Sequence, residues 1–356
     1  MMVTAKILSG LVYRPLLCSK LQNYNFYDLG TAIKERGSFI LDIDTDRKLS
    51  ISWWVSPKRT RSYPYARVYD TIGNQLRKVT IIPILKDEGK EGDRDFIQWD
   101  TISLMSLLNI YVMIAYYKNA KKSKKYRNKI TKQEFDIDYL KKEIFNLLDY
   151  KSCALHWNLA QVDKIPELAS IAIKNYRDIS KKLGVEMHSD KRLNVLVENI
   201  LNNKNNFINY SRSLAKKAQI REVSTVQPKE KTEGSKIAIT IENYLGGVYY
   251  FTCDQAETRN SKLYLIECKH TAYDELPSIG DIKDGLLKII LYKNLEETRI
   301  DNNNEVKVRA CLRLTSKLIE NKDDIKRKKR ILNQIIEEAK INNFSIMYND
   351  QFIYDF

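Results

Sequence analysis

The sequence is poor in the residues that hold metals and cofactors through nitrogen or sulfur. Its 356 residues include only three histidines, and no two of them lie close enough in sequence to suggest a metal-binding pair. The five cysteines are scattered and none forms a CxxC pair, which argues against a zinc ribbon or a thioredoxin-like motif. A histidine-based hydrolase is therefore disfavoured, and any catalytic metal would have to be held by carboxylates.

Long apolar runs and nucleotide-binding loops are also lacking. The longest apolar run, residues 110–117, is far shorter than a membrane-spanning helix, and residues 1–15 lack the apolar core and cleavage site of a signal peptide. We therefore expect a cytoplasmic protein with reduced thiols and no membrane partner. The chain has no Walker A loop, GxGxxG motif or helicase motif, which indicates that it carries no ATP-driven motor.

What the sequence has in excess is positive charge. Sixty lysines and arginines stand against 45 aspartates and glutamates, which leaves a net charge of +15. A surface this basic attracts polyanions, and nucleic acid is the partner that these numbers favour over an anionic membrane. A basic cytosolic protein that never meets nucleic acid is the alternative that charge alone leaves open.

The pattern along the chain predicts an N-terminal α+β region over residues 1–221. Turn-rich segments with β-forming residues indicate strands at 39–46, 49–55 and 78–85, and an apolar helix is expected at 101–117. Helices are expected between residues 138 and 218 because apolar residues recur there at steps of three and four. A polar stretch at 222–235 is the expected linker or long loop.

Residues 236–356 predict a C-terminal α/β domain. Strands are expected at 236–242, 246–254 and 263–270, with a turn at 255–262 between the last two. Ser278 and Asp281 suggest a capping box that opens a helix, and a strand, a charged helix (317–340) and a short strand follow. The order β-β-β-α-β-α-β predicts a mixed central sheet flanked by helices, with a helix at 191–218 as a further candidate for its core.

Carboxylates and a lysine meet at the end of the expected hairpin. Side chains alternate along a strand, so Glu267 and Lys269 share one face and emerge where the strand leaves the core. If the turn centres on Asn260 and Ser261, Asp254 lies opposite Glu267, about 5 Å away, where like charges normally destabilise a sheet. A bound divalent cation reverses that cost. Mg²⁺ suits two carboxylates, a backbone carbonyl, waters and a substrate phosphate, and Lys269 could orient the attacking water or stabilise developing charge.

Asp254, followed after twelve residues by Glu267-Cys268-Lys269, resembles the signature of the PD-(D/E)XK nuclease superfamily, the fold of many type II restriction endonucleases. The family's αβββαβ core is matched by residues 191–314, although Cys253 stands where the family often has proline. The resemblance implies Mg²⁺-dependent DNA cleavage, in which Mn²⁺ may substitute. It also implies a metal site at Asp254, Glu267 and the Cys268 carbonyl, with Glu242 as the nearest candidate for an additional acid.

A nuclease domain joined to a large DNA-binding region without a motor looks most like a type II site-specific restriction endonuclease. Such proteins act on double-stranded DNA, commonly as homodimers, in restriction-modification systems that can include a cognate DNA methyltransferase. A repair or recombination nuclease of the same superfamily is the nearest alternative. A non-catalytic DNA-binding protein that retains the nuclease fold is an alternative from another class.

The tripeptide E-x-K is not specific by itself. It recurs at Glu88, Glu305, Glu320 and Glu338. Glu88-Gly89-Lys90 is the serious competitor because it follows an expected strand and has Asp70 upstream, although Gly89 and Gly92 suggest a turn. The plainest alternative for Asp254, Glu267 and Lys269 is an ion-pair cluster at the end of a sheet.

Two basic segments are the candidate DNA contacts. In the first, forked arginines alternate with tyrosine rings around a turn expected at Pro64. The rings could stack on bases, although a charged loop with inward-packed tyrosines fits nearly as well. The second is the run 121–132, for which a solvated helix end is the ordinary interpretation. The candidate residues are Lys58, Arg59, Arg61, Tyr63, Tyr65, Arg67, Lys121, Lys122, Lys124 and Lys125.

Overall fold

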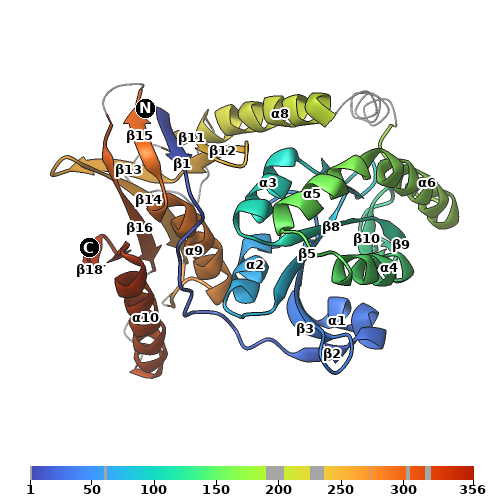
Figure 1. Cartoon of the computed structure of the whole chain (residues 1–356), viewed down its shortest axis with the longest axis horizontal. Helices are drawn as coiled ribbons and strands as arrows, with labels where there is room; N and C mark the ends of the chain where they lie inside the picture. The colour runs from blue at the N-terminus through green and yellow to red at the C-terminus, as the bar shows by residue number, and fades with distance from the viewer. Residues whose placement is uncertain are drawn as a thin grey trace. The chain divides into compact units, whose positions relative to one another are not determined.

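The computed structural model describes residues 2–59, 62–189, 204–224, 236–273, 275–301, 305–316 and 322–356. These fall into two compact units (Figure 1): unit 1, Met1–Lys20 with Ser213–Phe356, and unit 2, Leu21–Arg212. Both units mix helices with sheets, so the chain is of the α/β class. The observed boundary falls at Ser213, whereas the sequence predicts one near residue 221. The division differs also at the N-terminus, where residues 1–20 belong to the C-terminal unit. Of the expected linker, residues 222–224 belong to a helix, and 225–235 lie outside the described residues.

Unit 1 contains a four-stranded sheet in the order β12-β11-β1-β15. The N-terminal strand pairs in parallel with β11 and antiparallel with β15, which makes it a central strand. Its alternating buried side chains explain this position, since Val3, Ala5 and Ile7 all point into the core. The strands are β1 (Met2–Ile7), β11 (Ile237–Asn243), β12 (Val248–Cys253) and β15 (Glu296–Ile300).

A five-stranded sheet in the order β13-β14-β16-β17-β18 completes unit 1. Its central strands β14 and β16 are parallel and buried on both faces, as the continuous apolar sequence predicts. The sheet and its neighbouring helices comprise β13 (Gln255–Arg259), β14 (Lys262–His270), β16 (Lys307–Thr315), β17 (Ser345–Tyr348), β18 (Gln351–Tyr354), α9 (Ile279–Lys293) and α10 (Lys322–Asn342). Helix α8 (Lys204–Ser224) is divided between the units at Ser213, and its Gln219 donates to carbonyls of β11 and β12.

The chain passes from one sheet of unit 1 to the other at Asp254. Strand β12 ends at Cys253 and pairs with β11, whereas β13 begins at Gln255 and pairs with β14. The expectation of a turn over 255–262 is therefore wrong for most of its length, since β13 occupies residues 255–259. Only Asn260 and Ser261 make the turn, both with positive φ.

Helix α9 covers one face of β14 and β16 (Figure 1). The expected start of this helix is confirmed: Ser278 is the N-cap, and its hydroxyl accepts a hydrogen bond from the Asp281 backbone N–H at 3.1 Å. The Asp281 carboxylate accepts from the Ser278 hydroxyl, so the reciprocal half of the expected capping box runs through the side chain. The opposite face of β14 packs in an apolar cluster with Cys311 and Met347. Burial on both sides fixes the strand, and with it the residues at its end.

Unit 2 is built on a five-stranded sheet in the order β2-β3-β4-β5-β8. The three strands expected between residues 38 and 85 are confirmed as β3, β4 and β5. Two antiparallel pairs, β6 with β7 and β9 with β10, stand outside this sheet. The strands are β2 (Asn23–Asn25), β3 (Ser38–Asp42), β4 (Lys48–Trp53), β5 (Arg77–Pro83), β6 (Leu85–Asp87), β7 (Arg94–Phe96), β8 (Tyr111–Ala115), β9 (Tyr117–Lys122) and β10 (Ile130–Phe135).

Helices surround the strands of unit 2. The described residues confirm the helical region expected after residue 138 as far as residue 183. For the helix expected at 191–218, residues 191–203 lie outside the described residues and the rest belongs to α8. The helices are η1 (Phe26–Asp28), α1 (Leu29–Glu35), α2 (Pro64–Ile72), α3 (Trp99–Leu107), α4 (Ile137–Leu148), α5 (Ala154–Asp163) and α6 (Ile165–Leu183).

Two expectations for unit 2 are wrong. The helix expected at 101–117 ends at Leu107, Asn109 takes a left-handed conformation, and the following apolar run forms β8. A short run that is buried all round has no periodicity to separate strand from helix. Pro64 was expected in a turn but begins α2, where its fixed φ favours the first helical position. Within the described residues, no helix is both long and apolar enough to cross a membrane.

Candidate functional site

The end of β14 brings together the residues that the sequence singled out. Gln255 pairs with Ile266, and this register places Asp254 beside Glu267, as expected from the turn. Beyond the last β13–β14 pair, the backbone N–H of Cys268 donates to Asp254 Oδ2 at 2.8 Å. An extended residue directs its N–H and its C=O to the same edge, so the Cys268 carbonyl lies on the Asp254 side of the strand.

Two lysines hold the carboxylate of Glu267. Lys269 Nζ lies 3.0 Å from Glu267 Oε1, and Lys288 Nζ, from α9, lies 2.8 Å from Oε2. Lys269 also contacts Asp284 Oδ2 at 3.2 Å. The side chain of Glu267 is only 1% exposed, so it depends on these partners for its charged state. The cluster thus contains three carboxylates and two ammonium groups.

Helix α9 supplies the residues that sequence reasoning missed. Asp284 and Lys288 are four positions apart, so they project from the same face, and this face lies over β14. Gly285 permits this close approach: a Cβ at that position would lie 3.0 Å from Lys269 Cε and 3.0 Å from Leu312 Cδ1. An aspartate and a lysine on the otherwise apolar face of a helix were the sequence signal that could have identified them.

The electrostatics of the cluster follow from burial opposed by ion pairing. Burial, reinforced by the neighbouring Glu267, raises the pKa of Asp254 to about 6, although Lys288 opposes the shift. Burial would also raise the pKa of Glu267, but Lys288 and Lys269 outweigh it and hold that pKa below its usual value. Burial opposes the charged form of both lysines, yet Glu267 keeps their pKa values above the ordinary one. When all five groups are ionised, three carboxylates against two ammonium groups leave the cluster with one net negative charge.

The donor set fits a hard divalent cation. Asp254 and Glu267 offer carboxylate oxygens, and the Cys268 carbonyl lies at the same edge. The described residues contain no group of three His, Cys, Asp or Glu side chains placed to hold a metal. A metal here would thus take its remaining ligands from backbone, water and substrate, which is how Mg²⁺ is commonly bound and structural Zn²⁺ is not.

Glu242 is not brought to this cluster. It lies on β11 opposite Val248, whereas Ile237, at the other end of β11, lies opposite Cys253. Five residues of strand separate the two positions, which is about 16 Å at the usual rise per residue. The side chain of Glu242 is exposed, and on the adjacent strand β1 it pairs in register with Lys6.

The first basic segment is divided between surface and core. Lys58 and Tyr63 are exposed and Arg59 is partly exposed, whereas Arg61 lies outside the described residues. The other two residues face inward. Tyr65 is 3% exposed and packs edge-on against Trp54. The guanidinium of Arg67 stacks 4.4 Å from the Trp53 ring centroid and donates to the Trp53 carbonyl at 2.8 Å. These contacts commit Tyr65 and Arg67 to the packing of unit 2.

The second basic segment forms an exposed two-stranded ribbon, not a helix end. Residues 117–132 form β9, the connecting segment and the start of β10, and they include eight lysines and arginines and no aspartate or glutamate. Lys121 and Lys122 lie on β9, and Lys124 and Lys125 lie in the connecting turn; all four are exposed. A two-stranded β-ribbon is one of the elements that fits the major groove of B-DNA.

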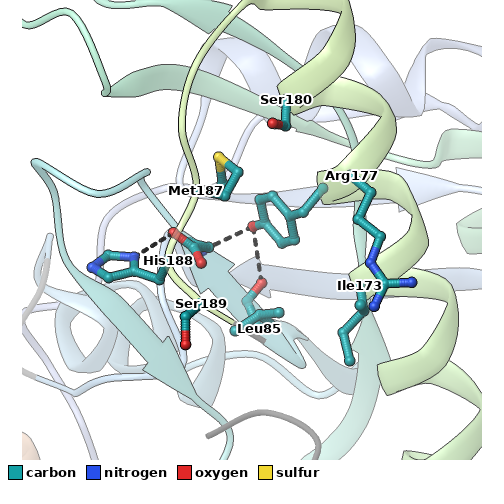
Figure 2. A pocket seen from close by; sticks show the side chains of 9 residues that line it. Leu85, Ile173, Arg177, Ser180, Met187, His188 and Ser189 are labelled. Atoms are coloured by element: carbon teal, nitrogen blue, oxygen red, sulfur yellow. Dashed lines mark hydrogen bonds and ion pairs between the residues drawn. The ribbon is translucent and has the colours of Figure 1, made fainter. Parts of the chain in front are cut away.

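The rival motif around Glu88 is dispersed. Glu88 pairs with Lys86 at 2.6 Å and with Lys129 at 3.2 Å, and these lysines outweigh burial and lower the pKa of Glu88 to about 2. Lys90 pairs instead with Glu186 at 3.0 Å. Asp70 lies on α2 and takes part in none of these three ion pairs. The segment borders a pocket in which His188 and Arg177 lie on opposite sides (Figure 2).

The remaining E-x-K tripeptides have structural surroundings. Glu305 makes an isolated bridge with Arg299. Glu338 is buried in α10, where its carboxylate accepts hydrogen bonds from the Tyr13 hydroxyl and from the backbone N–H of Leu17. Glu320 lies outside the described residues.

Comparison of the chain with known proteins found no matching family model, no matching curated protein and no matching solved structure.

Proposed function

We propose that the protein is a Mg²⁺-dependent endonuclease that hydrolyses phosphodiester bonds of double-stranded DNA. The observation that carries the proposal is the convergence of Asp254, Glu267 and Lys269 at the ends of adjacent strands. The element order α8-β11-β12-β13-β14-α9-β15-β16 supports a restriction-endonuclease-like core. Antiparallel strands precede the helix α9, and after β15 the chain returns as β16, which is parallel to β14.

Each residue has a role that its position supports. Asp254, Glu267 and the Cys268 carbonyl would hold Mg²⁺, or Mn²⁺ in its place, which supplies Lewis-acid stabilisation of a phosphate oxygen when bound. Lys269 is held against Glu267 and Asp284, where its ammonium group can orient water and stabilise negative charge developing on phosphorus oxygens. Lys288 is a positioning residue, since it fixes the second oxygen of Glu267.

DNA binding is assigned to unit 2. The exposed β9–β10 ribbon has the charge density to contact several phosphates, and Lys58 and Arg59 add further cations. Cleavage of both strands by a chain with one such site favours a homodimer. A type II restriction endonuclease with a cognate methyltransferase in the same system is the form that we favour over a repair nuclease, because the chain carries a large binding region without a motor.

Metal-dependent cleavage of plasmid DNA tests the proposal. Wild-type protein should cut with Mg²⁺ or Mn²⁺ and not in excess EDTA, and Glu267→Gln and Asp254→Asn should abolish cutting while DNA binding persists. Glu88→Gln is the matched control, since it neutralises the carboxylate of the rival motif. Cleavage by Glu267→Gln at the wild-type rate would exclude the site, and binding without any cutting by the wild type would favour a non-catalytic DNA-binding protein. Discrete fragments would support restriction, and a smear would support general degradation.

A further inference from the structure

Unit 2 contains a small pocket that the proposed cleavage site does not use. Its volume is about 210 Å³, and its walls come from β6, α6 and the segment that follows α6. Figure 2 shows His188 and Ser189 on one side and Arg177 with Ile173, both on α6, on the other. The pocket holds roughly seven waters at about 30 Å³ each, which is smaller than most sites for drug-sized ligands. It therefore suits a small ligand of one or two fused rings.

A buried carboxylate faces this pocket. The side chain of Asp87 is only 3% exposed, and its Oδ1 accepts hydrogen bonds from His188 Nδ1 and from the Gly89 backbone N–H, both at 2.8 Å. Its second oxygen, Oδ2, has no hydrogen-bond partner among the described residues and is not sealed inside the protein. Oδ2 is therefore available to accept a hydrogen bond from water or from a ligand in the pocket.

The other polar groups around Asp87 are satisfied within the protein. The Tyr176 hydroxyl donates to Gln133 Oε1 at 2.6 Å and accepts from the Asp87 backbone N–H at 3.0 Å. Ser180 Oγ donates to the Val185 carbonyl at 2.8 Å. Leu85, Ile173 and Met187 contribute apolar surface to the pocket. The pocket thus combines apolar surface from these three side chains with the polar side chains of Asp87, Arg177 and His188, and such mixed linings orient a ring that carries polar groups.

The outer wall of the pocket is tied to basic residues. Three hydrogen bonds anchor residues 184–189: Lys122 Nζ donates to the Gly184 carbonyl at 3.2 Å, the Lys90 backbone N–H to the Glu186 carbonyl at 2.9 Å, and Arg94 Nη1 to the Ser189 carbonyl at 3.0 Å. This wall therefore meets the β9–β10 ribbon at the end of β9, beside the basic connecting turn. A polyanion held on that turn would lie beside the wall of the pocket.

We propose that this pocket binds a single amino-bearing base of DNA, such as cytosine, that has left the helix stack, with Asp87 Oδ2 accepting a hydrogen bond from the exocyclic amino group. An ionised carboxylate offers only acceptors, so it favours the cytosine amino group and disfavours thymine, whose oxygen occupies the same position. The inference rests on the proposed function only in taking DNA as the ligand, and His188 acts as a positioning residue that orients the carboxylate.

Binding to short duplexes with one unpaired base tests the inference, because an unpaired base leaves the stack at least cost. Fluorescence anisotropy in EDTA should give about tenfold tighter binding to a duplex with an unpaired cytosine than to one with an unpaired thymine. Asp87→Asn should abolish this preference, because the amide can turn its NH₂ toward thymine. Met187→Trp should abolish it by filling the pocket without touching the polar network. Glu186→Gln, which removes an exposed carboxylate from the same wall, should retain it.

Equal affinity of the wild-type protein for the two duplexes would overturn the inference. So would a preference for cytosine that survives in folded Asp87→Asn or Met187→Trp protein, or one that disappears equally in Glu186→Gln. The melting temperature of each variant identifies any that fail to fold, and the polar and steric variants test the same point by different routes. Because binding is measured without metal, its outcome is separate from that of the cleavage assay.

Discussion

Lys288 offers the sharpest test of how the carboxylate cluster is held together. Its ammonium group lies 2.8 Å from Glu267 Oε2, with only 18% of its own side chain and 1% of the Glu267 side chain exposed. Lys288→Met keeps the apolar stem of the side chain and removes the charge, which leaves one oxygen of a buried carboxylate without its partner. Removing one member of a buried ion pair costs about 3–5 kcal/mol of unfolding free energy. We expect about 3 kcal/mol, the lower end, because Lys269 still contacts the other oxygen.

Mg²⁺ should reverse part of this loss. The metal supplies the positive charge that Lys288 provided, so it should stabilise the Lys288→Met protein more than the wild type. A ligand present at a hundred times its Kd raises the free energy of unfolding by about 2.7 kcal/mol. Each kcal/mol raises the melting temperature of a protein of this size by about 2–4 °C. Thermal unfolding with and without Mg²⁺ measures both quantities, and Mg²⁺ titration by calorimetry measures affinity directly.

The matched control is Lys293→Met. Lys293 lies on the same helix, and burial alone lowers its pKa, so no carboxylate stabilises its charge. This substitution should change the unfolding free energy little and leave the Mg²⁺ response at the wild-type value. The reasoning is refuted if Lys288→Met is within about 1 kcal/mol of the wild type and gains no more from Mg²⁺ than the wild type does.

Three further outcomes follow from the same contacts. The pKa of Asp254 is raised to about 6, which favours the protonated form in the folded protein. The unfolding free energy that this group contributes in acid is therefore lost as pH rises through 6. A proton competes with a metal for this carboxylate, so calorimetric Mg²⁺ affinity should fall about tenfold per pH unit below 6; a flat profile between pH 5 and 7 would contradict this. Gly285→Ala should shift Lys269 by a few tenths of an ångström and slow cleavage about tenfold or more. The overpacking should cost no more than about 1–3 kcal/mol of unfolding free energy. An unchanged single-turnover rate would count against the role of Lys269. Lys121→Ala and Lys124→Ala should each lower the slope of log affinity against log salt by about one unit on any duplex, and unaltered slopes would move the DNA contact away from the ribbon.

The candidate site could be predicted from sequence to the extent that it depends on one hairpin. The apolar alternation around Leu263 and Leu265 identifies a buried strand, and the Asn260–Ser261 turn sets its register with the preceding strand. Those two local features place Asp254 beside Glu267 and Lys269 on the Glu267 face. The capping box at Ser278 likewise predicts the start of α9 without reference to the rest of the chain.

Only the tertiary structure decided which distant residues complete the cluster. Lys288 and Asp284 reach β14 because α9 packs on that face of the sheet, and helix periodicity gives the shared face of the pair but not the strand beneath it. The N-terminal strand β1 joined unit 1 through parallel pairing with β11, more than two hundred residues away, which no local pattern specifies. Long-range packing likewise decided that residues 111–115 form strand β8 and that Tyr65 and Arg67 pack inward. Burial on all sides removes the periodic signal on which sequence interpretation depends, and long-range packing determines the outcome.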